Sequence, residues 1–273
     1  MTELSAVERL LCRDRVLLVS AMGVLFLLAG LYTILGIGME MSSLEMTATG
    51  GMRDTTRMHE PGAWGPSRAL LVFLMWWVMM IAMMLPGVTP AILLHAALLR
   101  HGGSGGALPT ASAAFLCGYI SAWAGFSLLA TLAQWGAEVA GVVSPAMMAL
   151  ASPLPGGLLL IAAGAFQFTA LKASCLDHCR SPMHFFSERR RPRTGGAFRM
   201  GMEHGTYCLA CCWVLMALLF VGGIMNLYWI VGLSAYVALE KCLPAGRGLS
   251  RAAGSILIFW GSAIVVLHSR IAW

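Results

Sequence analysis

Charged residues are scarce in this sequence: they make up 11% of its 273 residues, whereas hydrophobic residues make up 59%. A soluble globular domain carries about 25% charged residues, so the composition excludes that class. Disorder is excluded as well, because so much apolar surface does not stay solvated. Neither a nucleotide-binding loop nor a haem-attachment motif appears, so ATP-driven pumping by this chain alone is not expected. The composition predicts a polytopic membrane protein.

Seven apolar runs are each predicted to cross the membrane once, since a transmembrane helix needs about 20 apolar residues. The predicted spans lie near residues 16–38, 69–99, 110–135, 156–171, 206–225, 226–243 and 252–271. As one helix, the stretch 206–243 would be about 57 Å long, which is too long for a hydrocarbon core of about 30 Å. We therefore place a turn at Gly222, Gly223 and Asn226. The sequence predicts an all-α helix bundle that forms a single transmembrane domain over residues 1–273.

Lysine and arginine are unevenly distributed over the predicted loops. With the N-terminus in the cytoplasm, 14 of the 18 Lys and Arg residues fall in inner segments and four in outer segments. Cytoplasmic loops of membrane proteins carry the excess of these residues, so we expect a cytoplasmic N-terminus. The formal net charge of +6 is then explained by topology and by contact with membrane lipid, and no nucleic-acid partner is expected. The run 16–38 has no small-residue cleavage pattern after it, so we expect a retained span.

All eight cysteines lie on the predicted cytoplasmic side or in the inner part of a span. Thiols in that compartment stay reduced, so a disulfide framework is not expected. Cys12, Cys117 and Cys242 stand apart from the others, and burial as small apolar residues is the simplest interpretation of them. The other five cysteines fall in two clusters.

The two clusters combine thiols with imidazoles at helical spacing. They consist of Cys175, His178 and Cys179 at the inner end of the fourth span, and of His204, Cys208, Cys211 and Cys212 at the inner start of the fifth. Each set shares one helix face, and consecutive spans run antiparallel, so the two sets can face one another at one depth. Thiolate and imidazole ligands select Cu(I), zinc or iron. We predict a metal or redox site here; plain packing of thiols is the alternative.

Ionisable groups near the inner ends of the spans are further candidates, because charge inside a membrane is costly and often functional. Glu240 and Lys241 close the sixth span, and Lys172 precedes the first cluster. Glu240 could be a metal ligand, could orient a ligand, or could pair with Lys172. His95, at the inner end of the second span, could add an imidazole or could be an ordinary hydrogen-bonded histidine of the bundle.

Methionine is abundant, with 19 residues. Met75, Met79 and Met83 recur at i, i+4 and i+8 in the second span, with Met80 and Met84 on the adjoining row. Thioethers are uncharged soft ligands, so this row could pass Cu(I) across the hydrocarbon layer; packing in an apolar bundle is the alternative. The preceding outer loop could first collect the ion with Met39, Met41, Met46, Met52, Met58 and His59.

Three ordered motifs carry a resemblance to a known family. They are WVMMIAMMLP at 77–86, KASCLDHCRSP at 172–182 and GMEHGTYCLACCW at 201–213, followed by Glu240 and Lys241. Over about residues 70–245 the chain resembles the DUF2182 family, bacterial integral membrane proteins with predicted metal binding. The resemblance implies a multi-pass protein of the bacterial cytoplasmic (inner) membrane. It also implies metal binding by Cys175, Cys179, Cys208, Cys211 and Cys212. The assignment of His178 and His204 rests on spacing alone.

Three hypotheses for the function follow. In the first, the protein handles or transports Cu(I), which passes from the Met-rich helix to the inner Cys/His site and on to a soluble acceptor protein. In the second, the inner site does metal- or thiol-dependent redox chemistry, with Glu240, Lys172 and Tyr207 as candidate acids and bases. In the third, zinc joins the fourth and fifth spans as a structural ion. We favour copper over zinc or iron, because outer methionines have no use in the other two hypotheses.

Overall fold

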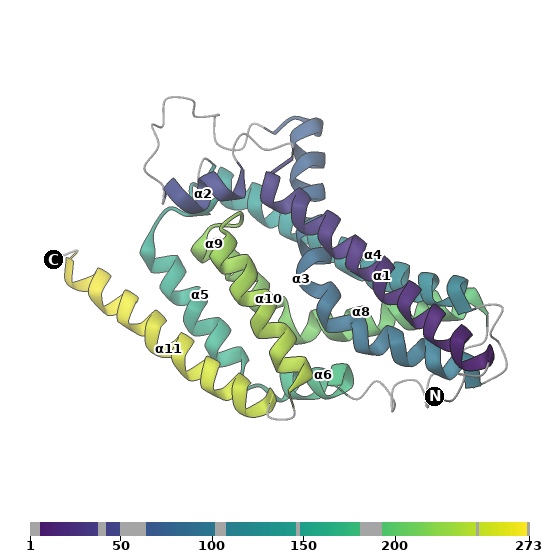
Figure 1. Cartoon of the computed structure of the whole chain (residues 1–273). Coiled ribbons are helices and arrows are strands. Elements are labelled where there is room, and N and C mark those ends of the chain that lie inside the picture. Colours follow the sequence, from purple (N-terminus) through teal and green to yellow (C-terminus); the bar gives the residue numbers. More distant parts are fainter. Residues whose placement is uncertain are drawn as a thin grey trace.

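The computed structural model describes residues 6–37, 42–49, 64–101, 108–145, 148–180, 193–243 and 246–271, and it confirms the all-α class (Figure 1). The helices are α1 (Ala6–Leu35), α2 (Ser43–Thr49), α3 (Pro66–His101), α4 (Leu108–Val139), α5 (Pro153–Phe166), α6 (Ala170–Arg180), α8 (Thr194–Ala217), α9 (Leu219–Gly222), α10 (Leu227–Cys242) and α11 (Gly246–Ile271). Between α4 and α5, the strands β1 (Val143–Ser144) and β2 (Ala149–Leu150) form a minimal antiparallel pair.

Among the described residues, five helices are long and apolar enough to cross a membrane, or six if the bent pair of α5 and α6 counts as one span. The five are Val16–Leu35, Pro66–Arg100, Pro109–Val139, Thr194–Gly222 and Gly246–Arg270. The sequence predicted seven. The difference lies in two predicted spans. The span 156–171 corresponds to the 14-residue helix α5, which reaches a crossing length only together with α6, and the span 226–243 is the 16-residue helix α10. At a rise of 1.5 Å per residue, α10 is about 24 Å long, less than a hydrocarbon core of about 30 Å.

The break predicted inside 206–243 is confirmed. Helix α9 ends at Gly222, and Gly223 has a φ of 92°, a backbone conformation that favours glycine. Asn226 then caps α10, because its side chain accepts a hydrogen bond from the backbone N–H of Tyr228 at 3.0 Å. The start of the fifth span was placed too late, at 206. Helix α8 begins at Thr194. Its first turns contain no apolar run that would reveal them in the sequence, but they belong to a helix that packs on α4.

Glycine brings α4 and α8 into backbone contact. A Cβ atom added at Gly201 of α8 would lie 1.9 Å from the carbonyl oxygen of Phe115, and one added at Gly118 of α4 would lie 2.0 Å from that of Phe198. Gly205 makes a similar approach four residues after Gly201. Small residues spaced by four allow helices to pack this closely within membranes. The contact fixes the depth of the second cysteine cluster, which follows on α8, relative to α4.

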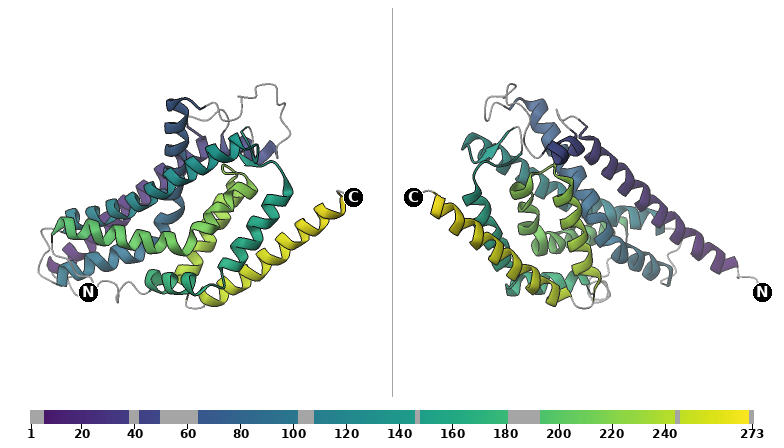
Figure 2. Two further views of the ribbon diagram at one scale, coloured as in Figure 1. Left: turned by 180° about the vertical axis from the view of Figure 1, so that it is seen from behind. Right: turned by 60° about the vertical axis from the view of Figure 1, so that its left-hand side comes forward.

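Helices α5 and α11 form a second closely packed pair, which Figures 1 and 2 show side by side and antiparallel at one edge of the molecule. Gly164 faces Gly254, and Gly157 faces Gly261, with backbone atoms of one helix where a Cβ on the other would lie. Helix α10 lies between this pair and α3 and contacts both α11 and α3. The bend of 65° between α5 and α6 turns α6 under the bundle, towards α8.

The glycine contact can be tested with a matched pair of Gly→Ala substitutions. Gly201→Ala should lower the free energy of unfolding by about 1–3 kcal/mol, because its methyl group overlaps the α4 backbone. Gly125→Ala, on α4 but with open space at its Cβ position, should instead raise it by up to about 1 kcal/mol through the higher helix propensity of alanine. Equal effects in thermal unfolding of the detergent-solubilised protein would contradict close packing at Gly201.

Candidate functional site

Cys208, on α8, is the centre of the candidate site. Its sulfur accepts a hydrogen bond from the Nζ atom of Lys241 on α10 at 2.9 Å and lies 3.0 Å from the hydroxyl oxygen of Tyr119 on α4. All three residues are buried. Three helices therefore converge on one sulfur atom, which has an ammonium group and a hydroxyl group among its neighbours.

Three further cysteines lie beside Cys208, and we define the thiol cluster as Cys179, Cys208, Cys211 and Cys212. Cys179, on α6, interacts with the side chains of both Cys208 and Cys211. Cys212 also interacts with Cys208 and Cys211. Cys175, one turn before Cys179, is close enough to Cys211 for an electrostatic interaction. The structure thus brings the two predicted sets of cysteines together across α6 and α8.

The thiol cluster is not arranged as a ready-made metal site. Over the described ranges, no group of three His, Cys, Asp or Glu side chains has the geometry to hold a metal ion. The thiols of Cys211 and Cys212 donate hydrogen bonds to the backbone carbonyl of Cys208, at 3.0 and 2.9 Å. The Cys208 sulfur itself accepts a hydrogen bond from Lys241. A metal ion bound here would have to replace these hydrogen bonds, with release of thiol protons.

His178 lies apart from the thiol cluster. Its ring is exposed and stacks on Tyr207, with centroids 4.5 Å apart and an interplanar angle of 6°. Its Nδ1 atom is 2.9 Å from the backbone carbonyl oxygen of Ser174. The helical spacing that groups His178 with the neighbouring cysteines therefore does not bring its imidazole to the sulfur atoms in this structure.

His204 is buried beside the thiol cluster, one turn before Cys208 on α8. Its ring tilts against those of Phe115 and Tyr119, with centroids 6.0 and 6.1 Å away. The ring of His95 also stacks on Phe115, with centroids 5.1 Å apart. The two buried imidazoles thus belong to an aromatic layer that joins α3, α4 and α8. His204 also interacts electrostatically with Cys208.

Glu240 forms a buried ion pair with Lys172, which was one of the three roles that the sequence left open for it. The two side chains are 0% and 1% exposed, and Nζ lies 2.8 Å from Oε1. Tyr236 and Ser250 also donate hydrogen bonds to the Glu240 carboxylate. These extra bonds matter because a buried ion pair offsets its desolvation cost only when its remaining polar atoms are satisfied. The pair links α6 to α10.

Tyr119 was not singled out by the sequence, and Lys241 only as one of several charges near a span end. An isolated tyrosine within an apolar run gives no periodic signal, and a lysine near a span end can simply reach water. The structure instead turns Lys241 inward past Gly87, where an added Cβ would lie 3.2 Å from Lys241 Cδ. Gly87 lies between Pro86 and Pro90 in α3, which changes direction along its length (Figure 1).

All members of the predicted methionine row are buried, and they share one core cluster with the cysteines. These are Met75, Met79, Met80, Met83 and Met84. The backbone carbonyl oxygen of Met84 lies 3.5 Å from the Tyr119 hydroxyl, so one end of the row adjoins the thiol cluster. Of the outer-loop candidates, the structure describes Met46, which packs against the core from α2. The others lie outside the described residues: Met39, Met41, Met52, Met58 and His59.

The remaining cysteines differ from their predicted role. Cys117 and Cys242 are exposed rather than buried, because they lie on the outer faces of α4 and α10. The side chain of Cys12 lies outside the described residues. The seven cysteines from Cys117 to Cys242 are free thiols, which agrees with the expected lack of disulfides. The exposed pair provides natural controls for the buried cluster.

Comparison of the sequence with known protein families finds a match. The family model PpoB2, described as a copper chaperone, matches residues 73–264. No curated protein and no solved structure matches the chain. The matched region runs from α3 into α11. It therefore contains the whole thiol cluster, Tyr119, Lys241 and the ion pair of Lys172 with Glu240.

The buried ion pair can be tested with a double-mutant cycle. Lys172→Met should lower the free energy of unfolding by about 3–5 kcal/mol, because it leaves the Glu240 carboxylate buried without its countercharge. Adding Glu240→Leu should recover most of this loss. As a control, Arg199→Gln breaks an exposed pair with Glu203 and should cost less than about 1 kcal/mol. The free energies of unfolding are measured in detergent. A double mutant no more stable than Lys172→Met would refute the coupling of the two residues.

Proposed function

The chain belongs to the PpoB2 copper chaperone family, and on that basis we propose that it binds Cu(I) at the thiol cluster around Cys208. The observation that carries the proposal is the meeting of Cys179 with Cys208 and Cys211 inside the bundle. Thiolates are soft ligands that select Cu(I). Helix bundles build metal sites from side chains that facing helices bring to one point, as α6 and α8 do here with cysteines.

Lys241 supports thiolate formation in this proposal. A thiol must lose its proton to bind a metal, and a bare thiolate in an apolar interior is costly. The ammonium group at 2.9 Å from Cys208 provides the opposite charge that offsets this cost. When Cu(I) binds, the Cys211 and Cys212 sulfurs can turn from the Cys208 carbonyl to the ion, since a thiol is a weak hydrogen-bond donor.

The methionine row is proposed as the route of the ion to the thiol cluster. The burial of the row supports this proposal, as does the position of Met84, whose backbone carbonyl oxygen contacts the Tyr119 hydroxyl beside Cys208. Thioethers bind Cu(I) without adding charge, so each step along the row avoids the cost of a buried anion. In the proposed orientation, the row leads inward from the outer face and the cysteines lie towards the cytoplasm.

The cellular setting belongs to the same proposal. The positive charge of the inner segments supports a cytoplasmic N-terminus, and the resemblance to the DUF2182 family supports a bacterial inner membrane. The family description as a copper chaperone supports delivery of the ion to another protein. We propose a soluble acceptor protein on the cytoplasmic side, next to the thiol cluster.

A second candidate function, thiol-dependent redox chemistry, is favoured by one observation. Tyr119 and Lys241 both contact the Cys208 sulfur, and a thiol flanked by groups that exchange protons is typical of redox sites. A structural zinc ion is the third candidate. Elemental analysis of protein purified from its own host separates copper from zinc. A colour, or a change of absorption on reduction, would favour the redox function.

The copper site predicts a selective effect of cysteine substitution. Cys179→Ser combined with Cys208→Ser should abolish stoichiometric Cu(I) binding, because it removes one thiol from each side of the cluster. Binding is measured by competition with a coloured Cu(I) chelator, on purified protein in detergent. The matched control is Cys117→Ser combined with Cys242→Ser, which removes two exposed thiols and should leave binding unchanged. Full Cu(I) binding by the first double mutant would exclude the site.

The methionine route predicts a loss of copper movement without a loss of the thiol site. Met79→Leu combined with Met83→Leu should slow Cu(I) uptake into proteoliposomes that contain a Cu(I) indicator. The fold should persist, because Met-to-Leu changes conserve volume and usually cost less than about 1.5 kcal/mol. Met200→Leu, at a buried methionine of α8 that is not a member of the row, is the control. Unchanged uptake by the double mutant would exclude the route and leave the thiol cluster as a binding site.

A further inference from the structure

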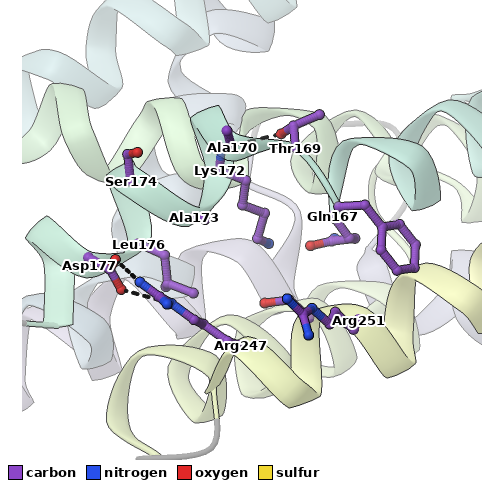
Figure 3. Close-up of a pocket in the computed structure, with 12 residues that line it drawn as sticks. Gln167, Thr169, Ala170, Lys172, Ala173, Ser174, Leu176, Asp177, Arg247 and Arg251 are labelled. Atoms are coloured by element: carbon purple, nitrogen blue, oxygen red, sulfur yellow. Dashed lines mark hydrogen bonds and ion pairs between the residues drawn. The ribbon is translucent and has the colours of Figure 1, made fainter.

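A polar pocket of about 230 Å³ lies where α5 bends into α6, against the first turns of α11 (Figure 3). Gln167 and Thr169 come from the bend, Lys172 from α6, and Arg247, Ser250 and Arg251 from α11. It is separate from the thiol cluster, since no cysteine lines it. The pocket takes no part in the proposed copper site, so that site does not explain the polar side chains that line the pocket.

Gln167 is the strongest sign that the pocket holds a ligand. Its residue is 4% exposed, yet across the part of the chain that the structure describes neither its Nε2 nor its Oε1 atom has a hydrogen-bond partner. Figure 3 shows its amide directed towards the side chain of Lys172. A buried polar group without partners costs about 1–3 kcal/mol. Such a cost is typical of a binding site, where a ligand satisfies the group.

The charges around the pocket favour an anion. Lys172 is balanced by Glu240, and Arg247 is balanced by Asp177. Arg251 is exposed, and no ion pair is found for it among the described residues, so the pocket keeps one positive charge. The pocket also meets the N-terminal turns of the 26-residue helix α11, where the helix dipole and free N–H groups attract negative charge.

The kinds of donors further favour phosphate. A guanidinium group offers a planar pair of N–H donors that suits the oxygens of a phosphate group. The Gln167 amide offers two more N–H donors, and the Thr169 hydroxyl lies at the same bend. We infer that this pocket binds the phosphate group of an anionic ligand, with Arg251 and Gln167 as its main donors.

The surroundings of the pocket admit two sources of that phosphate. Phe168, which lines the pocket, is 51% exposed, and Ile256 and Phe259 on α11 are 64% and 78% exposed. Apolar side chains beside a cationic pocket suit a phospholipid, with its headgroup in the pocket and its acyl chains along α11. A free phosphate or small phosphate ester would use the same donors without the apolar contacts. The test therefore includes both.

The experiment measures thermal unfolding of the full chain in dodecylmaltoside micelles, followed by tryptophan fluorescence. One series adds inorganic phosphate at constant ionic strength, and a second adds phosphatidylglycerol, with diacylglycerol of the same acyl chains as its phosphate-free control. A ligand that binds only the folded protein raises the midpoint temperature. We expect phosphate or phosphatidylglycerol to raise the midpoint and diacylglycerol to leave it unchanged. A response to phosphatidylglycerol alone identifies the lipid as the source.

Two variants assign the effect to the pocket. Arg251→Gln should raise the concentration needed for half of the shift about tenfold, because it removes a charge-assisted contact. Arg270→Gln removes the same charge from the far end of α11 and should leave the shift unchanged. Gln167→Leu should also weaken the shift, though less than Arg251→Gln does, because a neutral hydrogen bond contributes less than a charge-assisted one. It should raise the midpoint of the ligand-free protein, since it removes the unsatisfied amide.

The outcomes that overturn the inference are equally defined. No shift with either phosphate source, or the same loss in Arg270→Gln as in Arg251→Gln, would exclude the pocket as a phosphate site. A lower ligand-free midpoint for Gln167→Leu, with an unchanged phosphate response, would show that the amide has a structural role. None of these results bears on the proposed copper function, because the variants leave every cysteine and methionine in place.

Discussion

A positive charge inside a helix bundle is stable only where the fold provides an opposite charge or strong acceptors beside it. This protein buries two lysines, and each determines how helices meet. Lys172 reaches Glu240 and so joins α6 to α10. Lys241, the next residue after Glu240, turns the other way and reaches Cys208 on α8. Since α10 supplies one partner to each contact, its position relative to α6 and α8 follows from these two contacts together.

Much of the architecture could be predicted because it depends on short-range patterns. Apolar runs predict long helices, and a glycine followed by a capping asparagine predicts the turn at Gly223 and Asn226. The meeting of the two cysteine sets was also predicted, although the fourth span is not straight: α6 is bent by 65° from α5 and contacts α8. These inferences need only helix periodicity and the thickness of a membrane.

Other features depend on tertiary geometry that no local pattern encodes. His178 has the spacing of a ligand, but the bend before α6 and the stacking on Tyr207 place it outside the thiol cluster. Tyr119 reaches Cys208 only because glycines let α4 and α8 touch. The phosphate pocket was not predicted either, because Gln167 and Arg251 are far apart in sequence and meet only when α5 packs against α11.

At the copper site proposed above, the ammonium group of Lys241 would favour a monovalent ion over a divalent one wherever two thiolates bind the ion. Two thiolates around a monovalent ion carry one excess negative charge, which the buried ammonium cancels. The same two thiolates around a divalent ion are already neutral, so the ammonium would be left without a countercharge in an apolar interior, where such a charge is costly. In the proposed two-thiolate site, the buried lysine would thus favour Cu(I) over Zn(II) by electroneutrality, a preference that sulfur ligands alone do not provide.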